Sequence, residues 1–198
     1  MSIPAADQQP TVDAPDPPPE VRSTKRRALI EWAVILVVAL LAALLLRTFV
    51  VQPYFIPSGS MEPTLKINDK VLVNKLSYDF HSVHRGDVIV FKKPADDTTP
   101  GIKDLIKRVI GLPGETISSE HGYVYINGVR LNEPWLPKVD QGVTFGIKPT
   151  LIPPGEYYVM GDNRTDSADS RVIGPIPKSL IVGRAFIRVW PLSRIGTL

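Results

Sequence analysis

The chain has 198 residues, no cysteine and 20 prolines, and its formal net charge at pH 7 is +3. The absence of cysteine excludes a disulfide scaffold, a cysteine-ligated zinc site and a thiol nucleophile. The charge is too small to indicate nucleic-acid binding without a clustered basic patch. A mean hydropathy of +0.03 is high for a chain with 22% charged residues, and it indicates one strongly apolar segment in an otherwise polar sequence.

Residues 1–21 contain six of the prolines and four acidic residues but few large apolar residues. Such a segment cannot bury enough apolar surface to offset the entropy of ordering. We therefore expect a disordered tail over residues 1–27 that ends in a basic flank. A proline-rich docking motif is the alternative interpretation.

An unbroken apolar run of 15 residues extends from Trp32 to Leu46, and we predict a transmembrane helix over residues 28–51. As a helix, these residues would reach roughly 36 Å, enough to cross a hydrocarbon core of about 30 Å. A buried core helix is a poor alternative because the run has no polar face. A cleavable secretory signal is a closer one, but no small-x-small cleavage site follows the run.

The basic residues are distributed unevenly about the apolar run. Four precede it, whereas Arg47 alone follows closely, which predicts a cytoplasmic N-terminus and a single pass through the cytoplasmic membrane. Residues 52–198 are then expected outside the cytoplasm, and they carry the whole charge surplus of +3. A slightly positive surface is favourable for a domain that acts near anionic lipid headgroups.

Residues 52–198 are predicted to be mainly β structure, an all-β barrel or sandwich of short strands. The predicted strands are Lys70–Asn74, Asp87–Lys92, two strands within Tyr123–Leu131, Glu156–Met160 and Leu180–Trp190. Asn127-Gly128 between two alternating segments is a strong hairpin signal. Short helical turns are expected at Met61–Leu65, Lys103–Arg108 and Pro177–Leu180. Such a fold does not by itself define a function.

Two of the three histidines, His81 and His84, form an H-x-x-H pair in a polar stretch. The pair could begin a metal site, or either histidine could supply the base of a Ser-His-Asp triad. No third metal ligand follows at a suitable spacing, so surface-loop histidines are the favoured interpretation.

A serine nucleophile is indicated in residues 56–65. Ser58-Gly59-Ser60 puts two hydroxyls around a residue that allows a sharp turn and a close backbone approach, and prolines stiffen both sides. A nucleophile needs a fixed rotamer and a nearby amide N–H to hold an oxyanion. A plain turn stabilised by serine hydroxyls is the alternative.

Lys107 lies in a mostly apolar stretch, residues 105–110. If this stretch is a strand, Lys107 shares one face with Leu105 and Val109, while Arg108 points to the other side. A lysine pressed onto an apolar face loses solvation, its pKa falls, and the neutral amine can act as a general base. The alternative is an edge-strand lysine that protects against aggregation.

Residues 161–171 follow a predicted strand, and most of them carry hydroxyl, acidic or basic groups. This density suggests a hydrogen-bonded support for a nearby site. A solvated turn is the alternative.

Together, four segments resemble type I signal peptidases, the membrane-anchored Ser-Lys endopeptidases that remove signal peptides from exported proteins. They follow an N-terminal membrane segment in the family's order: IPSGSMEPTL (56–65), RGDVIVFK (85–92), IKRVIGLPGE (106–115) and MGDNRTDSADSR (160–171). The resemblance covers about residues 28–190. It implies a barrel-like β catalytic core over 52–198 and neither a cofactor nor a metal. Some members have a large second domain between the lysine and the Gly-Asp-Asn loop. In this chain, residues 118–154 leave room there only for a small β extension.

Carried over by motif, the resemblance implies that Ser60 is the nucleophile and Lys107 its general base. The Ser60 backbone N–H and the Ser58 hydroxyl would form the oxyanion hole, and Ser167 would hydrogen-bond the Lys107 amine. The implied supporting ion pairs are Asp162 with Arg108, and Asp169 with Arg171. Substrates would have small side chains at the first and third positions before the cut. The residues expected to line those shallow pockets are Ile56, Met61, Leu65, Val90 and Ile106.

The implied partners are the signal peptides of exported preproteins, membrane lipid and a neighbouring secretion translocon. Only eight residues, Gln52 to Gly59, separate the predicted anchor from Ser60. They span at most roughly 27 Å when extended, so the site is expected near the outer membrane face.

Three other functions stay open at this point. A related Ser-Lys peptidase could have another target, as in pilin-processing or organelle-type enzymes. A membrane-anchored scaffold could use the same fold to bind exported chains without cutting them. A soluble Ser-Lys autoprotease is the third, and the predicted anchor counts against it.

Overall fold

The computed structural model describes residues 22–95 and 103–198. The predicted disorder of residues 1–21 therefore lies outside the described residues. The chain divides into two compact units, one ending at Ala43 and the other running from Leu44 to Leu198, and each is described by itself.

Helix α1, Arg22–Phe49, contains the predicted apolar run. Its segment Arg26–Leu44 has a mean hydropathy of 2.3 and is long and apolar enough to cross a membrane, judged by length and composition. The helix bounds differ from the prediction at both ends. Residues 22–27, expected as a disordered basic flank, are helical, in keeping with the good helix propensity of arginine and lysine. Val51, expected inside the span, instead begins the first strand because it pairs with Asn74.

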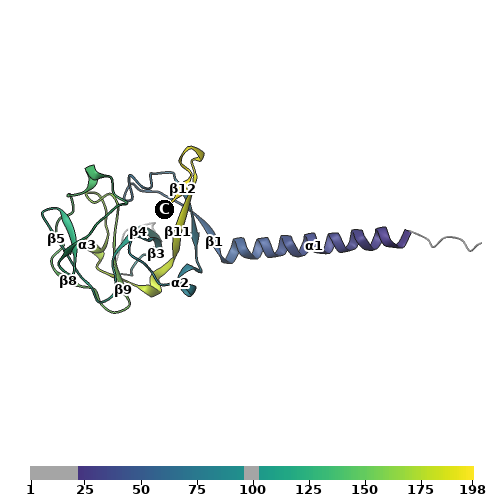
Figure 1. Ribbon diagram of the computed structural model, residues 1–198, viewed down its shortest axis with the longest axis horizontal. Helices are drawn as coiled ribbons and strands as arrows, with labels where there is room; N and C mark the ends of the chain where they lie inside the picture. Colours follow the sequence, from purple (N-terminus) through teal and green to yellow (C-terminus); the bar gives the residue numbers. More distant parts are fainter. Residues whose placement is uncertain (1–21, 96–102) are drawn as a thin grey trace, which may run out of the picture. The chain divides into compact units, whose positions relative to one another are not determined.

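The second unit contains two antiparallel sheets (Figure 1). The larger sheet has the strand order β1-β2-β11-β3-β4-β9-β10, and β12 pairs with β11. Its strands are β1 (Val51–Phe55), β2 (Lys70–Asn74), β3 (Val88–Lys92), β4 (Asp104–Gly111), β9 (Glu156–Met160), β10 (Ile176–Pro177), β11 (Ile181–Trp190) and β12 (Gly196–Thr197). Mainly β structure after an apolar helix is confirmed. The pairings among the described residues leave this order open between β1 and β10, so closure into a barrel is not observed.

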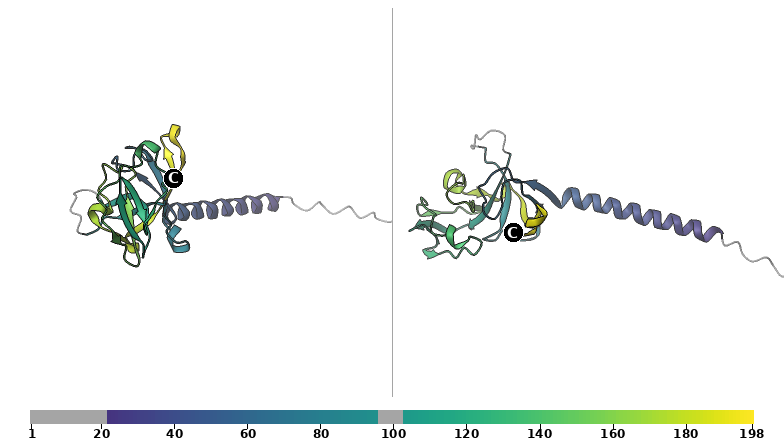
Figure 2. Two further views of the ribbon diagram at one scale, coloured as in Figure 1. Left: turned by 60° about the vertical axis from the view of Figure 1, so that its left-hand side comes forward. Right: turned by 90° about the horizontal axis from the view of Figure 1, so that it is seen from above.

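The smaller sheet has the strand order β7-β6-β5-β8 and corresponds to the predicted β extension. Its strands are β5 (Thr116–Glu120), β6 (Tyr123–Ile126), β7 (Val129–Arg130) and β8 (Thr150–Leu151). The hairpin at Asn127-Gly128 forms as predicted, and both residues have positive φ, 52° and 78°, which two-residue hairpin turns of this kind require. Figure 1 shows β5 and β8 at the end of this unit that lies away from β1 and β12, and Figure 2 gives two further views of the sheets.

Short helices fill the connections. They are α2 (Ser77–Phe80), η1 (Lys138–Asp140), α3 (Ser170–Ile173), η2 (Lys178–Leu180) and η3 (Leu192–Arg194). The helical turn predicted at 177–180 is confirmed as η2, whereas residues 61–65 form turns without a regular helix. The helical turn expected at Lys103–Arg108 is wrong. Most of that segment belongs to β4, because its apolar residues pair with β3, with Ile106 opposite Val90.

Three clusters of buried apolar side chains form the core of the second unit. One of them joins the turn after β1 to strands β2, β3 and β11, and includes Ile56, Met61 and Leu65. Since Met61 directly follows Ser60, this cluster fixes the turn that carries the predicted nucleophile. A second cluster packs the smaller sheet against residues of β4 and β9.

Candidate active site

Ser60 and Lys107 meet although they lie in different elements. Ser60 is in the turn between β1 and β2, and Lys107 is in the middle of β4, opposite Ile89 of β3. The Lys107 Nζ atom donates a hydrogen bond of 2.6 Å to Ser60 Oγ. Only 3% of Lys107 is exposed to solvent. The structure therefore brings the two residues into the geometry that proton transfer between a serine hydroxyl and an amine requires.

The electrostatic surroundings of Lys107 favour its neutral form. Burial lowers its pKa from 10.5 to about 8, because the ammonium loses water. The negative charges of Asp169 and Asp162 oppose this change, and the positive charge of Arg171 adds to it. A neutral amine is thus accessible at moderately alkaline pH, at which an ordinary exposed lysine stays charged.

Two hydrogen bonds from Asn163 hold the backbone of the nucleophile turn. The Asn163 backbone N–H donates to the Ser60 carbonyl oxygen at 3.1 Å. The Asn163 side-chain amide donates to the Gly59 carbonyl oxygen at 3.2 Å. The Ser58 hydroxyl lies 3.5 Å from Ser60 Oγ. The sequence predicts no individual role for Asn163, although this residue lies within the polar segment 161–171.

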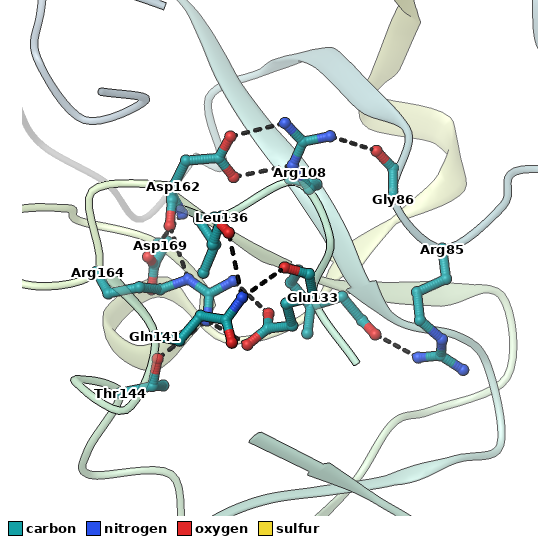
Figure 3. A network of polar contacts seen from close by, with 12 residues as sticks. Arg85, Gly86, Arg108, Glu133, Leu136, Gln141, Thr144, Asp162, Arg164 and Asp169 are labelled. Carbon is teal, nitrogen blue, oxygen red and sulfur yellow. Dashed lines mark hydrogen bonds and ion pairs between the residues drawn. The ribbon is translucent and has the colours of Figure 1, made fainter. Parts of the chain in front are cut away.

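Arg108 and Asp162 form a buried bidentate ion pair, with N···O distances of 2.8 and 2.7 Å (Figure 3). Each charge has further partners. Thr64 Oγ1 donates to Asp162 at 2.6 Å, and Arg108 donates to the Gly86 carbonyl oxygen at 2.7 Å. The guanidinium of Arg108 also lies 5.3 Å from the centre of the Trp135 ring. Through Thr64, this pair connects β4 and the polar loop to the nucleophile turn.

Asp169 and Arg171 form the second expected ion pair, with N···O distances of 2.8 Å. Asp169 also accepts the backbone N–H of Gly161 at 2.9 Å and caps the first turn of α3. Burial raises the pKa of Asp169, but Arg171 and the backbone donors outweigh it, so the pKa lies below its ordinary value. Asp169 therefore joins the two ends of the 161–171 loop and holds the Gly161 backbone in place.

The hydrogen bond expected between Ser167 and Lys107 is not formed in this structure. Ser167 Oγ is buried and has no hydrogen-bond partner among the described residues. Its hydroxyl lies so close to Gly161 that a Cβ on that glycine would be only 2.3 Å away. The amine of Lys107 is directed to Ser60 instead.

The residues expected to line the shallow substrate pockets are mostly core residues. Four of them expose at most 1% of their surface: Ile56, Met61, Leu65 and Val90. Ile106 is half-buried and packs against the same cluster. Accessible apolar pockets formed by these side chains are therefore not observed. They pack tightly together because they close the hydrophobic core under the nucleophile turn.

A buried ion pair that the sequence did not predict ties the polar loop to the segment after β7 (Figure 3). The guanidinium of Arg164 makes two hydrogen bonds to the Glu133 carboxylate, one of them at 3.0 Å. Arg164 also donates to Thr144 Oγ1 at 2.9 Å and to the Gly161 carbonyl oxygen at 3.1 Å. No periodicity or motif relates two residues 31 positions apart, so only the polar density of 161–171 pointed toward this contact.

The histidines lie apart from this chemistry. His81 and His84 are exposed, and neither makes a hydrogen bond to Ser60 within the described residues. His84 Nδ1 is 4.0 Å from an Asp87 carboxylate oxygen. In the part of the chain that the structure describes, no three histidine, aspartate or glutamate side chains are grouped to hold a metal ion. The surface-loop interpretation of both histidines is confirmed.

Comparison with known proteins gives the class of the chain, which is a hydrolase and a serine peptidase. A family model described as signal peptidase, peptidase S26, matches residues 29–190. The chain is 40% identical over 167 residues to a probable signal peptidase I-2 of Synechocystis, covering 82% of this chain and 74% of the relative. It is 39% identical over 193 residues to a signal peptidase I of Leptolyngbya laminosa, covering 96% and 94%. The chain therefore belongs to the signal peptidase family, peptidase S26.

A crystal structure of a signal peptidase I from Enterococcus faecalis is also similar. It has 31% sequence identity and a TM-score of 0.45, and the match covers 52% of this chain and 97% of that one.

Proposed function

We propose that this chain is a membrane-anchored serine endopeptidase that removes N-terminal signal peptides from exported preproteins, with Ser60 and Lys107 as its catalytic dyad. The observation that carries the proposal is the 2.6 Å contact between Lys107 Nζ and Ser60 Oγ, made by a lysine whose pKa burial lowers to about 8. The family supplies the reaction class, and relatives named signal peptidase I supply the substrate class.

The geometry suits a two-step acyl transfer. Neutral Lys107 takes the Ser60 hydroxyl proton while Oγ attacks the carbonyl carbon before the cut. The Ser60 backbone N–H and the Ser58 hydroxyl hold the resulting oxyanion. When the tetrahedral intermediate collapses, the Lys107 ammonium returns its proton to the leaving amine and an ester to Ser60 remains. Water then attacks the ester with Lys107 again as the base, which releases the signal peptide and restores the serine.

Selection of small side chains before the cut agrees with the packing around the nucleophile turn. The cluster of Ile56, Met61 and Val90 exposes at most 1% of each residue, so these side chains form no deep apolar pocket for a substrate. Small side chains at the first and third positions before the cut need no such pocket. Larger ones would need the core to move, which costs packing energy.

We place the enzyme in the cytoplasmic membrane, with α1 as the anchor, the N-terminus in the cytoplasm and residues 52–198 outside. The uneven basic residues around the apolar run support this orientation. Strand β1 begins two residues after α1 ends, so the chain leaves the membrane directly into the catalytic sheet. Membrane lipid and a neighbouring translocon, from which signal peptides emerge, are the proposed surroundings.

Two substitutions test the dyad in the full chain. Ser60→Ala and Lys107→Ala should each lower the rate of preprotein cleavage by about 10⁴-fold or more. Nucleophile and base act as one unit, so the loss of either removes the contribution of both. Both variants should keep the circular-dichroism spectrum of the parent protein. Lys103→Ala, which removes an exposed lysine just before β4, is the matched control and should cleave normally. Normal activity of Lys107→Ala would refute the dyad.

Substrate panels separate this function from the alternatives. Failure on ordinary preproteins with small-x-small sites, together with cleavage of other chains, would indicate a Ser-Lys peptidase with another target. Binding of preproteins without cleavage by the parent protein would indicate a scaffold.

A further inference from the structure

A polar cavity of about 320 Å³ opens beside the nucleophile turn, and the acyl-transfer chemistry does not use it. Three segments form its walls. They are the end of the nucleophile turn, the polar loop and the segment after β7, which contribute Glu62 and Pro63, Asn163 and Thr165, and Asp140 and Val143.

The cavity lies beside the backbone of the nucleophile turn. Asn163, one of its walls, donates through its backbone to the Ser60 carbonyl oxygen and through its side chain to the Gly59 carbonyl oxygen. Glu62 is bonded to Gly59 through its backbone N–H at 3.0 Å. A group that occupied the cavity would therefore lie within a few residues of the scissile bond of a bound chain.

The cavity shares no residue with the apolar cluster beneath the nucleophile turn. That cluster contains Ile56, Met61 and Leu65, whereas the cavity walls are mostly polar. The apolar signal-peptide part of a peptide laid extended across Ser60 is not suited to these walls, so the residues after the cut continue on the cavity's side of the serine. The polar cavity is the space available there for the residues that follow the cut.

The charges inside the cavity are unbalanced. Asp162 and Arg164 also line it, but each is neutralised by a buried ion pair, with Arg108 and Glu133 respectively. The side chains of Glu62 and Asp140 make no hydrogen bond or ion pair with any residue the structure describes. The cavity therefore presents two uncompensated carboxylates beside the nucleophile.

We propose that this cavity receives the first residues of the mature chain and that Glu62 and Asp140 favour a positively charged side chain there. The inference rests on the proposed function and extends it, because it names a sequence preference after the cut instead of before it. Glu62 and Asp140 are specificity-determining residues in this role and take no part in the proton transfers.

Peptide substrates that share one signal-peptide part test the proposal. Lysine, glutamine or glutamate is placed in turn at each of the first four positions after the cleaved bond. In the full-length protein, lysine should raise kcat/KM over glutamine by about threefold to fivefold at one or more positions, the scale of a partly exposed ion pair, and glutamate should lower it. The preference should shrink at high salt, since such pairs are screened.

Variants then assign the preference to the two carboxylates. Glu62→Gln and Asp140→Asn should each reduce the lysine-to-glutamine ratio, and the double variant should bring it to about one. The ratio is read within each protein, so a general loss of folded enzyme cancels. Asp79→Asn, which removes an exposed carboxylate in α2, is the matched control and should keep the parent ratio.

The outcomes separate the two proposals. Efficient cleavage with equal kcat/KM for lysine, glutamine and glutamate at all four positions would overturn the inference alone. A preference that both carboxylate variants retain would also overturn it. Failure of the parent protein to cleave every peptide would overturn the proposed function and this inference with it.

Discussion

Gly161 has no room for a side chain, although its φ is not positive. A Cβ there would lie 2.3 Å from the Ser60 carbonyl oxygen and 2.3 Å from Ser167 Oγ. The Ser60 carbonyl is backbone held by Asn163, so it cannot move without displacing the nucleophile. The requirement for glycine at this position therefore comes from the close approach of two loops at the proposed active site.

We expect Gly161→Ala to lower kcat by about 100-fold, the effect of a displacement of about 1 Å in a positioned group. Steady-state kinetics on a preprotein, with thermal unfolding of the same sample, would measure it. Gly196→Ala is the control, because the nearest atom to its added Cβ is 3.9 Å away, and it should leave kcat unchanged. Unchanged kcat in Gly161→Ala would show that the two loops separate easily.

Lys107 leads to a prediction about pH. The base must be neutral, and burial lowers its pKa to about 8, so the active fraction rises as the pH rises through this value. The acid limb of kcat/KM, measured between pH 6 and 10 on a substrate without titrating groups near the cut, should have its midpoint near 8. An ordinary lysine would put that midpoint above 10. A profile that is flat from pH 6 to 9 would contradict Lys107 as the base.

At the scale of elements, local patterns predicted local structure. The strands at Lys70–Asn74 and Glu156–Met160 were predicted to the residue, because β-branched and aromatic runs between turn formers need no distant partner to be recognised. Lys103–Arg108 was misassigned in the fold prediction. Charged residues at both ends of a short segment are typical of a helical turn. The segment nevertheless forms a strand, because it pairs with β3.

Long-range contacts explain why the site could be predicted only in part. The pairing of Ser60 with Lys107 came from resemblance to a family, since the two residues are 47 positions apart. The contact between Glu133 and Arg164 had no local signal at all. The burial of Met61 and Val90 was also missed, because a sequence does not show how closely a core packs beneath a turn.

The ion pair between Glu133 and Arg164 holds the segment after β7 against the polar loop, and both side chains are at least nine-tenths buried. Glu133→Gln leaves the arginine charge buried without its counterion, which should destabilise the protein by about 3 kcal/mol. Urea unfolding followed by tryptophan fluorescence would measure this. Glu120→Gln, in strand β5, is the control, since Glu120 is 68% exposed, and should change stability by less than about 0.5 kcal/mol. Equal stability of both variants would show that the pair contributes little.

The whole molecule consists of two units with separate proposed roles. The unit from Leu44 to Leu198 contains both sheets and every proposed catalytic residue. Membrane anchoring should therefore raise the rate at which enzyme and substrate meet, and leave the rate of peptide-bond cleavage in the bound complex unchanged. A preprotein held in the same membrane meets an anchored enzyme at a high effective concentration.

Removal of residues 1–49 tests this separation. The shortened chain should cleave a soluble signal-peptide substrate with a kcat within about threefold of the full chain, because the dyad lies wholly in the second unit. Its cleavage of a membrane-inserted preprotein in vesicles should fall by about 100-fold, the scale of a lost tethering advantage. Replacing residues 1–49 with an unrelated transmembrane helix of the same orientation should restore the second activity. If the shortened chain lost activity on the soluble peptide although it remained folded, the helix would contribute to the site itself, and the two units would not be functionally separate.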